Sequence, residues 1–224
     1  MASMSRRAWL GVCSLATLAG GLVGFPSRRS WASTSPREAI RERYFPNLVL
    51  TTHEGKQVRF YDDLIKDKIV TLNVFYTSCE EVCPLATANL VRVQELLGDR
   101  VGRDIFMYSI TLDPEHDTPE ALKAYATSHG VGPGWLFLTG KREDIELLRR
   151  TLGFTWADPV RDANKNNHTG NLRYGNEPLM RWGAVPAMAN ASWIKTCILY
   201  ADWPNKASLS EPTHRRSRSP WSAR

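Results

Sequence analysis

A chain of 224 residues with 42% hydrophobic residues is long enough for one ordinary domain and apolar enough to form a core, which excludes wholesale disorder. Its net charge of +6 resides at the ends, because residues 1–36 and 205–224 each carry +4 and residues 37–204 carry −2. The body therefore offers no general attraction for nucleic acid, and we expect no nucleic-acid partner.

The first 36 residues have the pattern of a targeting signal and linker. Arg6 and Arg7 precede a glycine-rich apolar segment, Ala8 to Phe25, and Ser30 to Ala32 offer a cleavage site. This pattern resembles a twin-arginine signal, so we expect an exported protein that is periplasmic or faces the periplasm from the membrane. The alternative is that Ala8 to Phe25 stays uncleaved as a short membrane anchor. We expect residues 26–44 to form a Ser/Arg-rich linker.

The elements that follow begin with a predicted hairpin, in which "LVLTT" and "VRF" flank Gly55. Ile69 to Tyr76 is a continuous apolar run, typical of a central strand that is covered on both faces. A helix is predicted from Pro84 to its stop at Gly98. Its apolar residues at helical spacing are Leu85, Leu90, Val93 and Leu97.

Strands and helices then alternate. "IFMYSITL" predicts a strand, Thr118 and Pro119 predict the cap and first residue of a helix, "WLFLTG" predicts a strand, and "KREDIELLRRTLG" predicts a helix. This order indicates βαβ units with parallel pairing. We therefore predict an α/β, thioredoxin-like domain over residues 37–203, with a central, mostly parallel sheet, helices on both faces and an N-terminal β-hairpin.

The pattern loosens after Asp158. "RDANKNNHTGNLRYGNE" is polar and predicts a loop, whereas "NASWIKTCIL" predicts a last short helix. Residues 204–224 are rich in Ser, Pro and Arg, and we expect them to be a basic disordered tail.

Cysteine usage points to a site. Because Cys13 is expected to leave with the signal, Cys79, Cys83 and Cys197 remain, and an odd count excludes a disulfide scaffold. Cys79 follows the predicted central strand, and Cys83 lies at the start of the next helix, where ligands bind in open α/β sheets and thiolates are stabilised.

The spacing of the pair narrows its chemistry. Dithiol oxidoreductases of this fold place two residues between their cysteines, whereas three lie between Cys79 and Cys83. Glu80 and Glu81 favour a bound cation over a free thiolate. A metal held by two thiolates needs a further ligand, and the candidates are His53, His116, His129, His168 and His214. His168 lies in the polar loop that can fold back over the first strand–helix turn.

Three blocks, "FYTSCEEVCP", "TLDPEHDTPEALKAYA" and "NHTGNLRYGNE", resemble the signature blocks of the Sco/SenC family of copper chaperones. The resemblance runs from about Tyr44 to about Ile198. It implies a thioredoxin-like fold and one copper ion, Cu(I) or Cu(II), bound by Cys79, Cys83 and His168. It also implies a respiratory copper protein, such as a cytochrome oxidase subunit, as the partner that receives the metal.

Three functions stay open at this point. The first is a copper metallochaperone without turnover chemistry. The second is a thiol–disulfide oxidoreductase in which Cys79 and Cys83 reduce the cysteines of that copper site, since a disulfide would eject the metal. The third is a thiol peroxidase, which Glu80 and Glu81 disfavour because a peroxidatic thiolate needs a positive neighbourhood. Asp113 matches the aspartate of the family's "DPE" block, and its alternative role is that of a turn residue.

Overall fold

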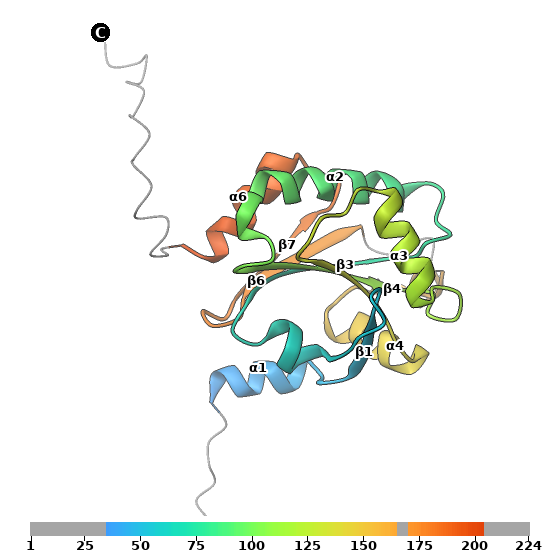
Figure 1. Ribbon diagram of the computed structural model, residues 1–224. Coiled ribbons are helices and arrows are strands. Elements are labelled where there is room, and N and C mark those ends of the chain that lie inside the picture. The colour runs from blue at the N-terminus through green and yellow to red at the C-terminus, as the bar shows by residue number, and fades with distance from the viewer. Residues whose placement is uncertain (1–34, 165–169, 204–224) are drawn as a thin grey trace, which may run out of the picture. The chain divides into compact units, whose positions relative to one another are not determined.

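The centre of the fold is a seven-stranded sheet in the order β2-β1-β5-β4-β3-β6-β7 (Figure 1). It is seen in a computed structural model that describes residues 35–164 and 170–203. The strands are β1 (Val49–Thr52), β2 (Gln57–Arg59), β3 (Ile69–Phe75), β4 (Ile105–Thr111), β5 (Trp135–Thr139), β6 (Asn171–Asn176) and β7 (Arg181–Pro186).

Three parallel strands form the middle of this sheet. β3 pairs with β4 along its whole length, from Ile69 opposite Ile105 to Phe75 opposite Thr111, and β5 continues the parallel arrangement on β4. The outer strands are antiparallel: β1 pairs with β5, β6 with β3, and β7 with β6. All seven residues of β3 are buried, as its apolar run predicts.

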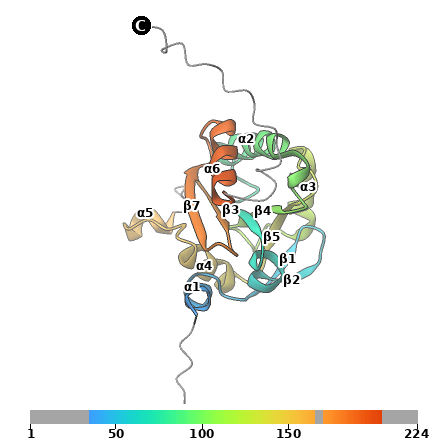
Figure 2. The same ribbon diagram turned by 90° about the vertical axis from the view of Figure 1, so that its left-hand side faces the viewer.

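Helices cover both faces of the sheet (Figures 1 and 2). One apolar core joins the sheet to α2, α3 and α6, and a second joins the opposite face to α1, η1 and α4. The helices are α1 (Pro36–Tyr44), the π-helical turn η1 (Phe60–Ile65), α2 (Val82–Leu97), the 3-10 turn η2 (Gly98–Arg100), α3 (Pro119–Ser128), α4 (Arg142–Thr151), α5 (Pro159–Ala163) and α6 (Ala191–Ala201).

The predicted local signals of the first half are confirmed. β1 and β2 form the hairpin, with Gly55 in its turn at φ +80°. Thr118 caps α3 by accepting the N–H of Ala121, and Pro119 is the first helical residue. One residue departs from the prediction: Leu85 is 61% exposed. Two residues along a helix turn the side chain by about 200°, so Leu85 lies opposite the buried Cys83.

Two segments were predicted wrongly. Residues 36–44 of the expected linker form α1, because Ser35 caps the helix by accepting the Glu38 N–H and Pro36 fits its first turn. Residues 171–176 of the expected loop form β6. Its polar residues gain partners there, as Asn176 does by donating to Asp202 at 3.2 Å, so composition alone conceals the strand.

Within residues 35–164 and 170–203, no helix combines the length and apolar character needed to cross a bilayer. The predicted signal or anchor, Ala8 to Phe25, and the predicted tail, residues 204–224, lie outside the described residues. The proposed domain boundaries therefore stay predictions.

Gly102, which precedes β4, and Gly134, which precedes β5, lie in close contact. A Cβ added to Gly134, which has φ +83°, would lie 2.4 Å from the Gly102 nitrogen. We expect Gly134→Ala to lower the free energy of unfolding by about 1–2 kcal/mol for the left-handed backbone plus about 1–3 kcal/mol for the overlap. Gly130, at φ +69° with open space around it, is the matched control. In urea unfolding, Gly130→Ala should lose only the free energy that the left-handed backbone costs. An equal decrease in the free energy of unfolding of the two variants would contradict this account.

Candidate metal centre

The two neighbouring cysteines lie beyond the carboxyl end of β3, where α2 begins. Both are free thiols; Cys79 is partly exposed and Cys83 is 2% exposed. The Cys79 sulfur accepts the backbone N–H of Cys83 at 3.4 Å. The predicted placement of the pair at a strand-to-helix turn is therefore confirmed.

The Cys79 sulfur takes the place of a helix cap. Glu81, at the cap position of α2, makes no side-chain capping bond, and Pro84 has no N–H to satisfy. Burial acts to raise the pKa of Cys79, but hydrogen bonds from the Cys83 thiol and from the N–H groups of Cys83, Glu81 and Val82 outweigh it, so that the pKa is lowered. The start of α2 thus stabilises a thiolate at Cys79.

Cys83 behaves in the opposite way. Burial, together with the hydrogen bond that its thiol donates to Cys79, raises the pKa of Cys83 to about 12. Burial, followed by a hydrogen bond to Cys79, also raises the pKa of Tyr76 to about 12. In the metal-free protein the Cys83 thiol and the Tyr76 hydroxyl therefore donate to the Cys79 sulfur, and Cys79 loses its proton more readily than Cys83.

Asp117 holds the turn that carries Cys79. Its carboxylate, 1% exposed, accepts the N–H of Thr77 at 3.1 Å and both the Thr77 and Thr111 hydroxyls. Thr77 follows β3 and Thr111 ends β4, so this one carboxylate joins the carboxyl ends of two adjacent strands. Sequence reasoning missed Asp117, although it lies in the "DPEHDTPE" block, because a buried carboxylate is not distinguishable from a solvated one by its neighbours in sequence.

Asp113 is a turn residue in this structure. Its carbonyl accepts the N–H groups of His116 at 3.1 Å and Asp117 at 2.9 Å, and its carboxylate contacts His116 Nδ1 at 2.9 Å. It therefore shapes the loop that presents Asp117. Glu80 and Glu81, by contrast, are exposed beside the thiols, where they leave a negative rim suited to a cation.

The described histidines are engaged in structural contacts. His53 accepts the Phe137 N–H at 3.1 Å, and burial lowers its pKa. His129 donates from Nδ1 to the Tyr125 carbonyl at 2.8 Å and stacks on that ring, while His116 pairs with Asp113. Among the described residues, no group of three Cys, His, Asp or Glu side chains is arranged to hold a metal ion. His168 and His214 lie outside the described residues.

The described chain resumes at Gly170, and this residue lies beside Cys83. Gly170 and Asn171 line one cavity together with Val82 and Cys83. The antiparallel register, with Leu72 opposite Arg173, explains this placement, because it sets the start of β6 against the end of β3.

Cys197 lies apart from the pair, in α6. It is partly buried against the core under α2 and α6. Burial, and then the charge and hydrogen bonding of Cys197, raises the pKa of Tyr174. Its surroundings agree with the expectation of a core cysteine.

Comparison with known proteins identifies the family. The family model described as SCO1/SenC matches residues 37–173. This chain belongs to the SCO1/SenC family. The predicted resemblance is therefore confirmed over most of the described domain.

Two curated relatives and one solved structure illustrate the similarity. A Stutzerimonas stutzeri protein named for copper binding is 29% identical over 134 residues, covering 59% of this chain and 64% of its own. The SCO1 protein homolog of Bacillus subtilis is 32% identical over 95 residues, covering 42% and 48%. Bradyrhizobium japonicum ScoI, solved with copper bound, superposes with a TM-score of 0.56 at 22% identity, over 68% of this chain and 96% of ScoI. The chain thus spans between about half and two thirds of these curated relatives, and the thioredoxin-like fold is confirmed.

The opposite pKa shifts of the two thiols predict selective alkylation. Below pH 9, Cys79 should react with iodoacetamide faster than Cys83, because alkylation requires the thiolate and the Cys83 pKa is about 12. The rate at Cys79 should rise with pH, with its midpoint below the ordinary cysteine pKa of 9.0. Cleavage at Glu80 and Glu81 separates the two cysteines for mass spectrometry of the metal-free, reduced protein. Equal rates at the two thiols would refute the opposite pKa shifts of Cys79 and Cys83.

Proposed function

We propose that this protein is a copper metallochaperone, in which Cys79, Cys83 and His168 hold one copper ion as cargo for a respiratory copper protein. The observation that carries the proposal is the reduced cysteine pair at the start of α2, with backbone N–H groups directed at the Cys79 sulfur. Membership of the SCO1/SenC family and the relative named for copper binding support copper as the metal.

The chemistry of the donor set fits a soft cation. Thiolates suit Cu(I), imidazole accepts either oxidation state of copper, and two sulfurs with one nitrogen leave room for an incoming acceptor ligand. A closed structural zinc site would need a fourth ligand. Cys83, whose pKa is about 12 without metal, has to release its proton when it binds the ion, so copper uptake releases protons and weakens as pH falls.

The position of His168 in the sequence supports it as the third ligand. It stands two residues before Gly170, which lines the cavity beside Cys83. The described histidines are committed to other contacts, as His53 is to Phe137. The exposed side of the pair, rimmed by Glu80 and Glu81, is the proposed side for transfer.

The proposed acceptor is the dinuclear copper centre of cytochrome oxidase or a similar site. A solved relative from the family, BsSco, is described as a member of the Sco family of cytochrome c oxidase assembly proteins. Transfer would proceed by exchange of ligands, with acceptor thiolates replacing Cys79 and Cys83 on the ion.

The asymmetry of the thiols favours one second function, thiol–disulfide exchange. The Cys79 thiolate would attack one sulfur of an acceptor disulfide and expel the other as a thiolate. Cys83, after losing its proton, would then attack Cys79, closing the internal disulfide and releasing the acceptor as a dithiol. Two electrons pass from the cysteine pair to the acceptor, so each turnover requires later reduction of the pair by a thiol reductant.

Copper titration of the reduced protein separates these functions. We expect one Cu(I) per chain, with binding weakened roughly a hundredfold or more by Cys79→Ser or Cys83→Ser and roughly tenfold or more by His168→Ala, since each 1.4 kcal/mol corresponds to a factor of ten. Cys197→Ser and His129→Ala are the matched controls and should bind like wild type.

Three outcomes decide against parts of the proposal. Wild-type protein that ignores copper but rapidly reduces a test disulfide would exclude the chaperone and support the oxidoreductase. Unchanged affinity in His168→Ala would remove only the third ligand. Loss of binding in Cys197→Ser would move the site away from α2.

We also propose that the twin-arginine pattern directs export, so that the site works in the periplasm. Replacing Arg6 and Arg7 with lysine keeps the charge and should leave the precursor in the cytoplasm, as measured by fractionation and immunoblotting. The same replacement at Arg28 and Arg29, which lie after the apolar segment, is the control and should be exported. Normal export of the first variant would exclude this route.

A further inference from the structure

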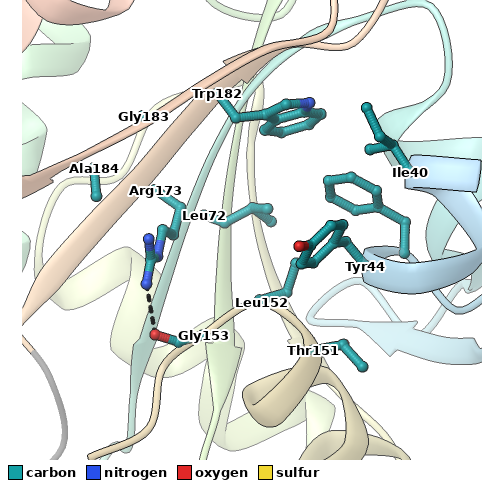
Figure 3. A pocket seen from close by; sticks show the side chains of 11 residues that line it. Ile40, Tyr44, Leu72, Thr151, Leu152, Gly153, Arg173, Trp182, Gly183 and Ala184 are labelled. Atoms are coloured by element: carbon teal, nitrogen blue, oxygen red, sulfur yellow. Dashed lines mark hydrogen bonds between the residues drawn. The ribbon is translucent and has the colours of Figure 1, made fainter. Parts of the chain in front are cut away.

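A second cavity lies on the face of the sheet opposite the cysteines. It measures about 390 Å³, within the range of roughly 300–1,000 Å³ that small-molecule sites occupy. Figure 3 shows Leu72 of the central strand between Arg173 on one side and Tyr44 on the other, with Trp182 above. The walls therefore come from β3, β6, β7, α1 and the end of α4.

Its lining is mostly apolar and carries one cation. Leu72, Ile40 and Trp182 supply the hydrocarbon and aromatic surface, and Trp182 is fixed against Phe45 with ring centroids 4.6 Å apart. Arg173 is the charged lining residue, and none of the lining residues is acidic. A preformed apolar cavity with a single charge is typical of a site that takes a ligand with one ionic group.

Arg173 has no carboxylate partner among the described residues. Its Nη2 donates to the carbonyl of Gly153 at 2.6 Å, and its guanidinium lies 5.7 Å from the Phe154 ring centroid. Its Nε is buried and has no hydrogen-bond partner in the described structure. A buried N–H without an acceptor is costly, and a partly buried cation is stabilised by an opposite charge.

An acidic residue of the adjoining pocket, which shares Ile40 and Trp182 with this cavity, is already paired. Glu177, which follows β6, accepts from Arg37 Nε at 2.6 Å and from the Tyr61 hydroxyl at 2.8 Å. Gly153 leaves room for the Arg173 guanidinium, because a Cβ at this position would lie 2.8 Å from Nη2. An anion that pairs with Arg173 would therefore be supplied by a ligand.

We propose that this cavity binds a small amphipathic monocarboxylate, with its carboxylate on the Arg173 guanidinium and its hydrocarbon body against Leu72, Ile40 and Trp182. The planar fork of arginine suits a carboxylate, and the apolar walls exclude a highly charged phosphate ester. The bound acid would place its negative charge against the guanidinium and would replace water on the apolar walls. The site is separate from the cysteine pair, since the sheet lies between them.

Decanoate is the test probe. Isothermal titration of the full chain should show one decanoate per chain, and the tryptophan fluorescence should change because Trp182 lines the cavity. Arg173→Leu should weaken binding tenfold or more, whereas Arg92→Leu, an exposed arginine on α2, should leave it unchanged. Ile40→Trp should also weaken binding by filling the cavity. Thermal unfolding of each variant verifies that it folds.

Two matched probes and one double variant complete the design. Decanol and decyltrimethylammonium should bind at least tenfold more weakly than decanoate. Cys79→Ser with Cys83→Ser should bind decanoate normally, so that failure here and failure of the copper proposal remain distinct. Absence of decanoate binding, equal binding of decanol, or wild-type affinity in a folded Arg173→Leu variant would each overturn the proposal.

Discussion

The buried carboxylate of Asp117 is the interaction on which the cysteine site depends. It accepts hydrogen bonds from Thr77, after β3, and from Thr111, at the end of β4. The parallel pairing of β3 and β4 brings these two residues to one edge of the sheet. Asp117 therefore holds the turn that carries Cys79. A residue of the "TLDPEHDTPEALKAYA" block in this way positions the first cysteine of the "FYTSCEEVCP" block.

The surroundings of the two thiols explain why their pKa values shift in opposite directions. Cys79 accepts N–H groups at the start of α2, whereas Cys83 is turned into the core beneath that helix. One thiol is therefore held ready to ionise, and the other retains its proton until a partner removes it. Cys83 gives up this proton to solvent when it binds a metal ion or attacks a disulfide, and the exposed Glu80 and Glu81 favour the cation.

The sequence predicted those parts of the fold in which local pattern and tertiary structure agree. The apolar run of Ile69–Phe75 is β3, and the cap at Thr118 starts α3. It did not predict β6, because polar residues such as Asn176 become strand residues only once a distant Asp202 satisfies them. The role of Asp117 and the cavity around Arg173 were not predicted for the same reason. The burial of Asp117 and the lack of a carboxylate partner for Arg173 among the described residues both arise from tertiary packing. The cysteine pair was found because its spacing and position are local.

The central claim is that Cys79 and Cys83 bind copper directly as thiolates. X-ray absorption at the copper edge of the Cu(I)-loaded protein tests it by counting the atoms bound to the metal. The account predicts a first shell with two sulfur atoms and one nitrogen atom, and one sulfur fewer in Cys83→Ser. A first shell without sulfur, or one unchanged in Cys83→Ser, would contradict it.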